Sequence, residues 1–181
     1  MVEKRSAYLV NASGGKTKRL GVRAIEGWSR DGKYIYVKSA ADTKGLFKTP
    51  VAGGNPVKVP AKCFDSGAIE SPDGKYLYYE GYDGNAFTIR RQRLQDGDDV
   101  QLISSVNADN FAVASTGIYF IPDGPHPAIQ FLSFADGKTS TIAKLPRMAL
   151  YGFSLSPDER YLLYTQYEDR GSNLMLVENF H

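Results

Sequence analysis

A short segment of this chain recurs at a regular spacing. Residues 71–79 read Ser-Pro-Asp-Gly-Lys-Tyr-Leu-Tyr-Tyr, and related segments occupy residues 28–37 and 156–164. The first lies about 42 residues upstream and the second about 85 residues downstream, which is twice that spacing. Each copy joins a tight turn to a β-rich run. A period of roughly 40 residues, with a hairpin turn in each unit, is typical of a β-propeller.

The rest of the chain can be divided on the same period. A degenerate third copy aligns at residues 111–120 with one residue deleted. Short strands separated by turn signals indicate an all-β fold, and no long stretch has the apolar spacing of a helix. We therefore predict an all-β fold, a β-propeller of about four four-stranded blades. The chain is expected to be a single propeller domain over residues 1–181, with repeat units at 22–60, 64–104, 107–144 and 148–181.

The strand after each motif turn is rich in aromatic and aliphatic residues. A near-continuous apolar strand predicts burial on both faces, as when neighbouring blades enclose it, and Trp28 is likewise expected to pack between blades. The aspartate of each motif is expected to be structural, because Asp caps such turns by accepting hydrogen bonds from nearby amides. The strands are 34–37, 76–79, 118–121 and 161–164, and the aspartates are Asp31, Asp73 and Asp158.

The chain ends do not coincide with unit boundaries. Residues 6–20 contain two strand-like runs and a turn, and these are expected to complete the last blade, which leaves one strand spare. Three arrangements stay open: a closed four-bladed ring with an extra strand, part of a longer propeller cut inside a blade, or two chains in an eight-bladed assembly. Exposed strand edges invite pairing. We therefore favour a homodimer that completes a larger propeller, or a longer parent protein, over a closed monomer.

Composition excludes several classes of function. The net charge of +2 argues against a nucleic-acid surface, which would show clustered Lys and Arg. The single cysteine, Cys63, excludes an intrachain disulfide and a cysteine-rich metal site. No apolar run reaches the length of a transmembrane helix, so no membrane insertion is expected. The N-terminus lacks the apolar core of a signal peptide. A cytoplasmic location is expected if the chain is complete as given, and an extracytoplasmic one stays open if it belongs to a longer protein.

At residues 71–79 the chain resembles the TolB-like, WD40-like repeat (PD40) β-propellers of bacteria. The resemblance extends over nearly the whole chain through the copies at 28–37, 111–120 and 156–164. Residues 172–180 look like the C-terminus of propellers attached to bacterial winged-helix regulators or kinases. The resemblance implies the fold and a role as an interaction platform, and the family has no shared catalytic motif. The effector domain expected beside such a propeller is missing here, which favours a truncated or split protein.

The loops that connect successive units are expected to line one mouth of the central channel. Their mixed charge suits a polar ligand or a peptide end, although solvated rim residues would look the same. A separate loop at residues 122–127 is stiffened by three prolines, because proline fixes φ, and a rigid loop suits recognition unless it is only a surface turn. The predicted ligand-binding residues are Arg23, Lys62, Asp109 and Arg147 in the connecting loops and His126 in the proline-rich loop.

Two further groups of side chains are weaker candidates for ligand-binding sites. Each loop after an aromatic strand has an aspartate, and carboxylates gathered on one face could bind Ca²⁺. These loops are expected to lie toward the outside of the blades, so no metal site is predicted. Strand alternation puts Arg91 and Arg93 on one face and Arg90 on the other, where phosphate binding competes with simple solubility of an outer strand. The loop aspartates are Asp42, Asp83, Asp123 and Asp169.

These features together predict a non-enzymatic binding module without a cofactor, whose partner is a protein or peptide. Such a module could be the sensory or scaffold part of a larger regulator. The alternative is a hydrolase or lyase with a polar site at the channel mouth, although the Gly-x-Ser-x-Gly motif of many hydrolases is absent. A third possibility is a fragment whose only property is self-assembly.

Overall fold

The computed structural model describes residues 6–22, 24–38, 45–61 and 67–168. The regular structure of these residues is entirely strand, and they include no helix able to cross a membrane. The strands are β1 (Tyr8–Leu9), β2 (Lys18–Arg19), β3 (Ala24–Trp28), β4 (Tyr34–Lys38), β5 (Leu46–Pro50), β6 (Val57–Val59), β7 (Ala68–Glu70), β8 (Tyr76–Tyr82), β9 (Phe87–Arg93), β10 (Asp99–Val106), β11 (Phe111–Val113), β12 (Gly117–Phe120), β13 (Ala128–Ser133), β14 (Thr139–Lys144), β15 (Ser154–Leu155) and β16 (Leu162–Leu163).

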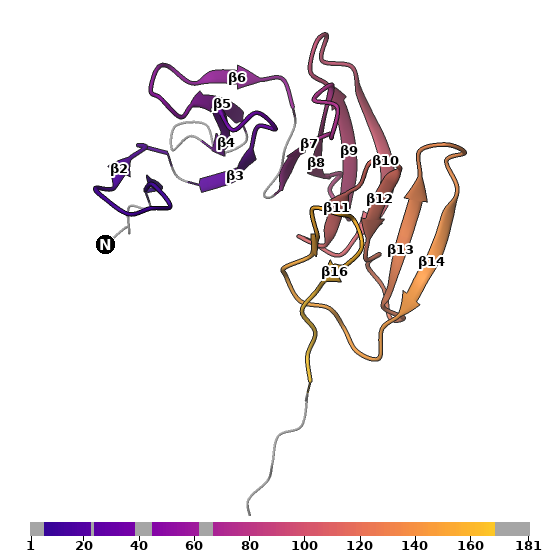
Figure 1. The fold of residues 1–181 in the computed structure, drawn as a ribbon. Helices are drawn as coiled ribbons and strands as arrows, with labels where there is room; N and C mark the ends of the chain where they lie inside the picture. The colour runs from indigo at the N-terminus through magenta and orange to yellow at the C-terminus, as the bar shows by residue number, and fades with distance from the viewer. Residues whose placement is uncertain (1–5, 23, 39–44, 62–66, 169–181) are drawn as a thin grey trace, which may run out of the picture.

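Successive strands pair as antiparallel neighbours, so each sheet is a meander. Three sheets have four strands each, β3-β4-β5-β6, β7-β8-β9-β10 and β11-β12-β13-β14, and we call them the first, second and third blades. Two-stranded sheets, β1-β2 and β15-β16, stand at the two ends of this series. Figure 1 shows the sheets following one another around an arc. The predicted all-β propeller with four-stranded blades is confirmed. The single-domain division and the place of residues 6–20 in the last blade stay predictions.

Apolar side chains fill the spaces between successive sheets. Alternation along β8 sends Leu77 and Tyr79 into the cluster shared with the first blade, while Tyr78 enters the cluster shared with the third blade. The strands after the motif turns in the complete blades are therefore buried on both faces, as predicted. The prediction is wrong for the last unit, where Tyr161 is 66% exposed and Leu163 is 73% exposed. Among the described residues, the β15-β16 sheet has a neighbouring blade on one side only.

The first strands of the first two blades approach each other closely. A Cβ atom on Gly27 of β3 would overlap the carbonyl oxygen of Ala68 on β7, so only glycine fits at this point. The expectation that Trp28 packs between blades is wrong, because its side chain is 52% exposed. The close backbone packing of β3 against β7 leaves little room there for an indole ring.

Carboxylates join neighbouring sheets by accepting hydrogen bonds from backbone amides. Each bond crosses from one sheet to the next, and each therefore helps to fix the angle between them. The donor and acceptor pairs are Arg30 N to Glu70 Oε2 at 2.8 Å, Asp109 N to Glu80 Oε1 at 2.7 Å, and Ser115 N to Glu159 Oε1 at 2.8 Å.

Candidate functional site

The repeated motif forms the same hydrogen-bonded turn in its three clear copies. In the second blade, Ser71 Oγ donates to Asp73 Oδ1 at 2.5 Å and accepts from the Tyr76 amide at 3.0 Å. The bond from Ser71 and that from the Lys75 amide lower the pKa of Asp73, so this carboxylate stays ionised. Gly74 has a φ of 69°, which glycine adopts without strain. The first and last copies form the same serine–aspartate bond, and the structural role predicted for the motif aspartates is confirmed.

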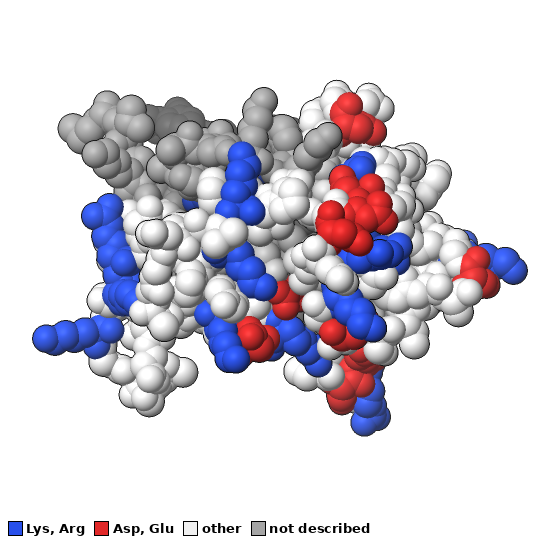
Figure 2. Space-filling view, turned by 90° about the horizontal axis from the view of Figure 1, so that it is seen from above, with Lys and Arg blue, Asp and Glu red and all other residues white. Residues whose placement is uncertain are grey.

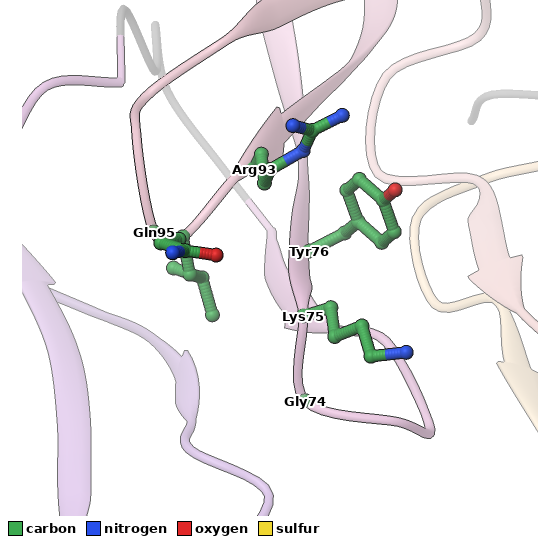
Figure 3. Close-up of a pocket in the computed structure, with 6 residues that line it drawn as sticks. Gly74, Lys75, Tyr76, Arg93 and Gln95 are labelled. Atoms are coloured by element: carbon green, nitrogen blue, oxygen red, sulfur yellow. The ribbon is translucent and has the colours of Figure 1, made fainter.

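Three adjoining hollows surround the turn of the second blade. Figure 3 shows the first, of about 490 Å³, where Arg93 and Tyr76 project to the same side of the β8-β9 hairpin. The second, of about 350 Å³, lies between the first and second blades, and the third, of about 510 Å³, lies between the second and third blades. We call the three together the turn-face groove. The residues that line two hollows each are Pro72, Asp73, Gly74, Tyr76 and Leu94.

The face that carries the groove has mixed charge. Figure 1 places the β9-β10 turn uppermost, and Figure 2 looks down on that side, where Lys and Arg side chains lie beside Asp and Glu side chains. Short ion pairs within the turns account for part of this pattern, such as Lys75 Nζ with Asp73 Oδ2 at 3.6 Å. Such a surface offers hydrogen-bond donors and acceptors side by side, which suits a polar chain better than a ligand of one charge.

The buried carboxylate of Glu70 lies at the base of the hollow between the first two blades. Glu70 accepts hydrogen bonds from Tyr36 Oη at 2.5 Å, Arg30 N at 2.8 Å and Lys48 Nζ at 3.1 Å. Burial raises the pKa of Glu70, but these three donors outweigh burial and hold the pKa below its ordinary value. Burial and the bond to Glu70 raise the pKa of Tyr36. The network pairs one carboxylate with one ammonium group, and it supports the groove from below.

The three arginines of β9 differ in their partners. Arg90 Nη2 pairs with Asp99 Oδ2 at 3.0 Å, and Arg93 Nη1 pairs with Asp96 Oδ2 at 3.0 Å. Arg91 instead lies over the Tyr76 ring, with its guanidinium carbon 4.6 Å from the ring centroid. The predicted alternation is confirmed by the β8-β9 register, in which Tyr78 is opposite Arg91 and Tyr76 is opposite Arg93.

The predicted ligand-binding residues lie away from this groove or outside the described residues. Arg23 and Lys62 lie outside the described residues, as do Asp42, Asp169 and residues 172–180. Asp109 precedes β11 with a φ of 61°, His126 is exposed in the β12-β13 loop, and Arg147 follows β14. These three do not line the hollows of the turn-face groove, and their role in binding stays a prediction.

Most residues of the turn-face groove were not predicted from the sequence as ligand-binding residues, because a structural role in the hairpin turn already explained the repeated motif. The pairing of β8 with β9 could have indicated that aromatic and arginine side chains gather at this place. Tyr76 and Tyr78 are two residues apart on β8, and Arg91 and Arg93 are two apart on β9, so the four side chains share one face.

Side chains typical of metal binding or acid–base catalysis are not gathered in the described part of the chain. No group of three or more His, Cys, Asp or Glu residues there could hold a metal ion. A general base must lie within hydrogen-bond reach of its proton donor. Exposed His126 makes no hydrogen bond with another described residue.

Comparison with solved structures shows which known proteins have a similar fold. TolB from Acinetobacter baumannii matches 93% of this chain with a TM-score of 0.77 and 19% sequence identity. This chain has the fold of TolB-like β-propellers. A TolB-like protein from Agrobacterium tumefaciens matches 88% of the chain with a TM-score of 0.65 and 19% identity. The tricorn protease matches 90% of it with a TM-score of 0.57 and 15% identity.

The TolB-like fold of this chain corresponds to only part of these larger proteins. The chain spans 44% of the Acinetobacter TolB, 66% of the Agrobacterium protein and 17% of the tricorn protease. No protein-family model matches the sequence, and no curated protein matches it either. The likeness therefore establishes the fold of the arc of blades.

Proposed function

We propose that this TolB-like propeller is a non-enzymatic binding module whose partner, a protein or peptide segment, lies in the turn-face groove. The observation that supports the proposal is the set of three adjoining hollows around the turn of residues 71–76. Together they follow the junctions from the first blade to the third. An extended segment lying across them would contact all three blades.

The lining of the groove supports a peptide as the partner. Aromatic residues and arginine are enriched at protein interfaces, and they supply most of the binding energy at many of them. Tyr76 is half-buried and lines two of the hollows, and Arg91 and Phe134 line one of them. Phe134 is 38% exposed, so its ring offers apolar surface that a bound side chain would cover.

A selection experiment tests this proposal. Heptapeptides selected on the immobilised protein from a random library are measured against the wild type and two matched variants. Tyr76→Ala removes a groove residue, and Tyr161→Ala removes the tyrosine at the same motif position in the last unit, where the side chain is 66% exposed. Loss of a central aromatic contact costs about 2 kcal/mol or more. We therefore expect about a thirtyfold loss of affinity for Tyr76→Ala and little change for Tyr161→Ala.

Three results would contradict the proposal. The first is that selected peptides bind Tyr76→Ala as well as they bind the wild type. The second is that both variants lose affinity equally. The third is turnover of ester or polysaccharide substrates that depends on His126 or Arg147, which would favour a hydrolase or lyase at the channel mouth.

A further inference from the structure

The hollow of about 510 Å³ between the second and third blades has an unusual composition. We call it the Arg91 hollow. It is lined on the second blade by Tyr76, Tyr78 and Arg91, and on the third blade by Phe134. The rings of Tyr78 and Phe134 are stacked, with centroids 5.8 Å apart and planes inclined by 18°. Tyr78 is almost fully buried, while Phe134 stays partly exposed, so the accessible apolar surface of the hollow belongs to Phe134.

Arg91 is the only β9 arginine whose guanidinium has no carboxylate partner among the described residues. Arg90 and Arg93 each pair with an aspartate at 3.0 Å. The stack on Tyr76 orients the Arg91 guanidinium and leaves its N–H groups without an anion among these residues. A planar guanidinium presents a donor fork that matches a carboxylate, and bidentate pairs of this kind are among the stronger hydrogen-bonded contacts.

The other polar groups of the Arg91 hollow are already engaged. Asp73 is held within its own turn by Ser71 Oγ and the Lys75 amide. Ser115 gives both its amide and its hydroxyl to Glu159, each at 2.8 Å. The hollow therefore offers one cation beside one fixed carboxylate. A singly charged carboxylate is matched by the one positive charge of Arg91, whereas a doubly charged phosphate would keep one uncompensated negative charge beside Asp73.

We infer that the Arg91 hollow recognises a carboxylate of a protein segment, with an apolar neighbour of that carboxylate lying on the exposed part of the Phe134 ring, which Tyr78 supports from behind. The inference rests on the proposed function, because it names the chemistry recognised within the turn-face groove. Arg91 anchors the anion, and the aromatic wall selects an apolar side chain next to it. The carboxylate belongs either to an acidic side chain or to the end of a chain.

Three labelled peptides distinguish these sources. The first, capped at both ends, has the sequence Gly-Ser-Glu-Phe-Glu-Ser-Gly, and the second replaces each Glu with Gln. The third, Gly-Ser-Gln-Phe with a free terminal carboxylate, carries its only negative charge at the chain end. Affinities are measured by fluorescence anisotropy. Amide chemical shifts of residues 71–76 show whether each peptide lies in the groove.

The variants are Arg91→Gln and, as a matched control two residues away on the same strand face, Arg93→Gln. A hydrogen bond to a charged group contributes about 1.5–3 kcal/mol. We therefore expect one of the carboxylate peptides to bind roughly ten to a hundred times more tightly than the capped Gln peptide. Arg91→Gln should abolish this preference. Arg93→Gln should keep it within about threefold, since that guanidinium is already paired with Asp96.

Several outcomes would overturn the inference. Equal binding of the acidic and neutral peptides, a preference that survives Arg91→Gln, or no binding by any of the three peptides would each do so. If peptides shift the amides of residues 71–76 in either of the first two cases, the groove is a binding site with other chemistry and the proposed function stands. If peptides bind and the shifts fall outside the groove, both proposals are wrong. An unchanged thermal midpoint for Arg91→Gln shows that any loss is not unfolding.

Discussion

Removal of the Glu70 side chain should destabilise the junction between the first two blades. The carboxylate accepts bonds from Tyr36, Arg30 and Lys48, and the Glu70 side chain is only 7% exposed. In Glu70→Ala the hydroxyl of fully buried Tyr36 loses its acceptor, which costs about 1–3 kcal/mol. The exposed Arg30 amide and the partly exposed Lys48 regain water, so together they add about 1 kcal/mol. We expect a total loss of about 3 kcal/mol.

Urea denaturation at pH 7 measures this loss. With a slope of about 2 kcal/mol per molar urea, the midpoint should fall by about 1.5 M. Glu70→Gln keeps the volume and one acceptor oxygen, so it should lose roughly half as much. Asp136→Asn is the surface control, because its partner Lys138 is 83% exposed, and it should change stability by less than about 0.5 kcal/mol.

The effect of Glu70 should also depend on pH. The folded protein holds the pKa of Glu70 below its ordinary value of 4.5, because the three donors outweigh burial. The folded state therefore binds this proton less tightly than the unfolded state, and the stabilisation is present above the unfolded pKa. It is lost as the pH falls through the folded pKa. The difference in stability between wild type and Glu70→Gln should be constant above about pH 6 and shrink as the pH falls below about 4.5.

A loss of less than about 1 kcal/mol for Glu70→Ala would refute this reasoning. A difference from Glu70→Gln that stays constant down to pH 3 would refute the part that depends on ionisation. The first result would mean that the carboxylate does not hold the first two blades together, and the second would mean that its contribution does not change with protonation above pH 3.

Two further predictions concern packing and assembly. Gly27→Ala should lower stability by about 3 kcal/mol in thermal unfolding, because its Cβ would overlap the Ala68 carbonyl, and an unchanged midpoint would contradict the close approach of β3 and β7. We also propose that two copies join through their two-stranded end sheets, since β2 carries Lys18 and Arg19 while the β15-β16 turn carries Glu159. Light scattering should give about twice the 20.0 kDa of one chain, and 20.0 kDa at every concentration would exclude the homodimer.

The local structure could be predicted from the sequence because the turn and the strand of each unit are determined by residues within that unit. The Asp-Gly turn at residues 73–74 closes a hairpin by local bonds, and the strand that follows is apolar because it lies between blades. Trp28 shows the limit of this reasoning. The exposure of Trp28 depends on how closely β3 and β7 pack. Neither the type of this residue nor its position in the motif reveals that distance.

The candidate site could not be predicted in the same way, because it depends on contacts between units. The Arg91 hollow needs Phe134 from the third blade to stack on Tyr78 from the second. The angle between those blades is fixed by tertiary bonds such as that from Asp109 N to Glu80. The sequence showed that Arg91 and Arg93 share a face, but only the structure showed that Arg93 has an aspartate partner while Arg91 lies over Tyr76.

We propose that partners bind on the turn face of the blades. Hydrogen–deuterium exchange of the protein with and without a library-selected peptide tests this claim most directly. We predict slower exchange at residues 71–76 and 93–95, with no change in the loops at 107–110 and 122–127. Protection of those two loops, with unchanged exchange at 71–76, would contradict this prediction and place binding at the opposite face.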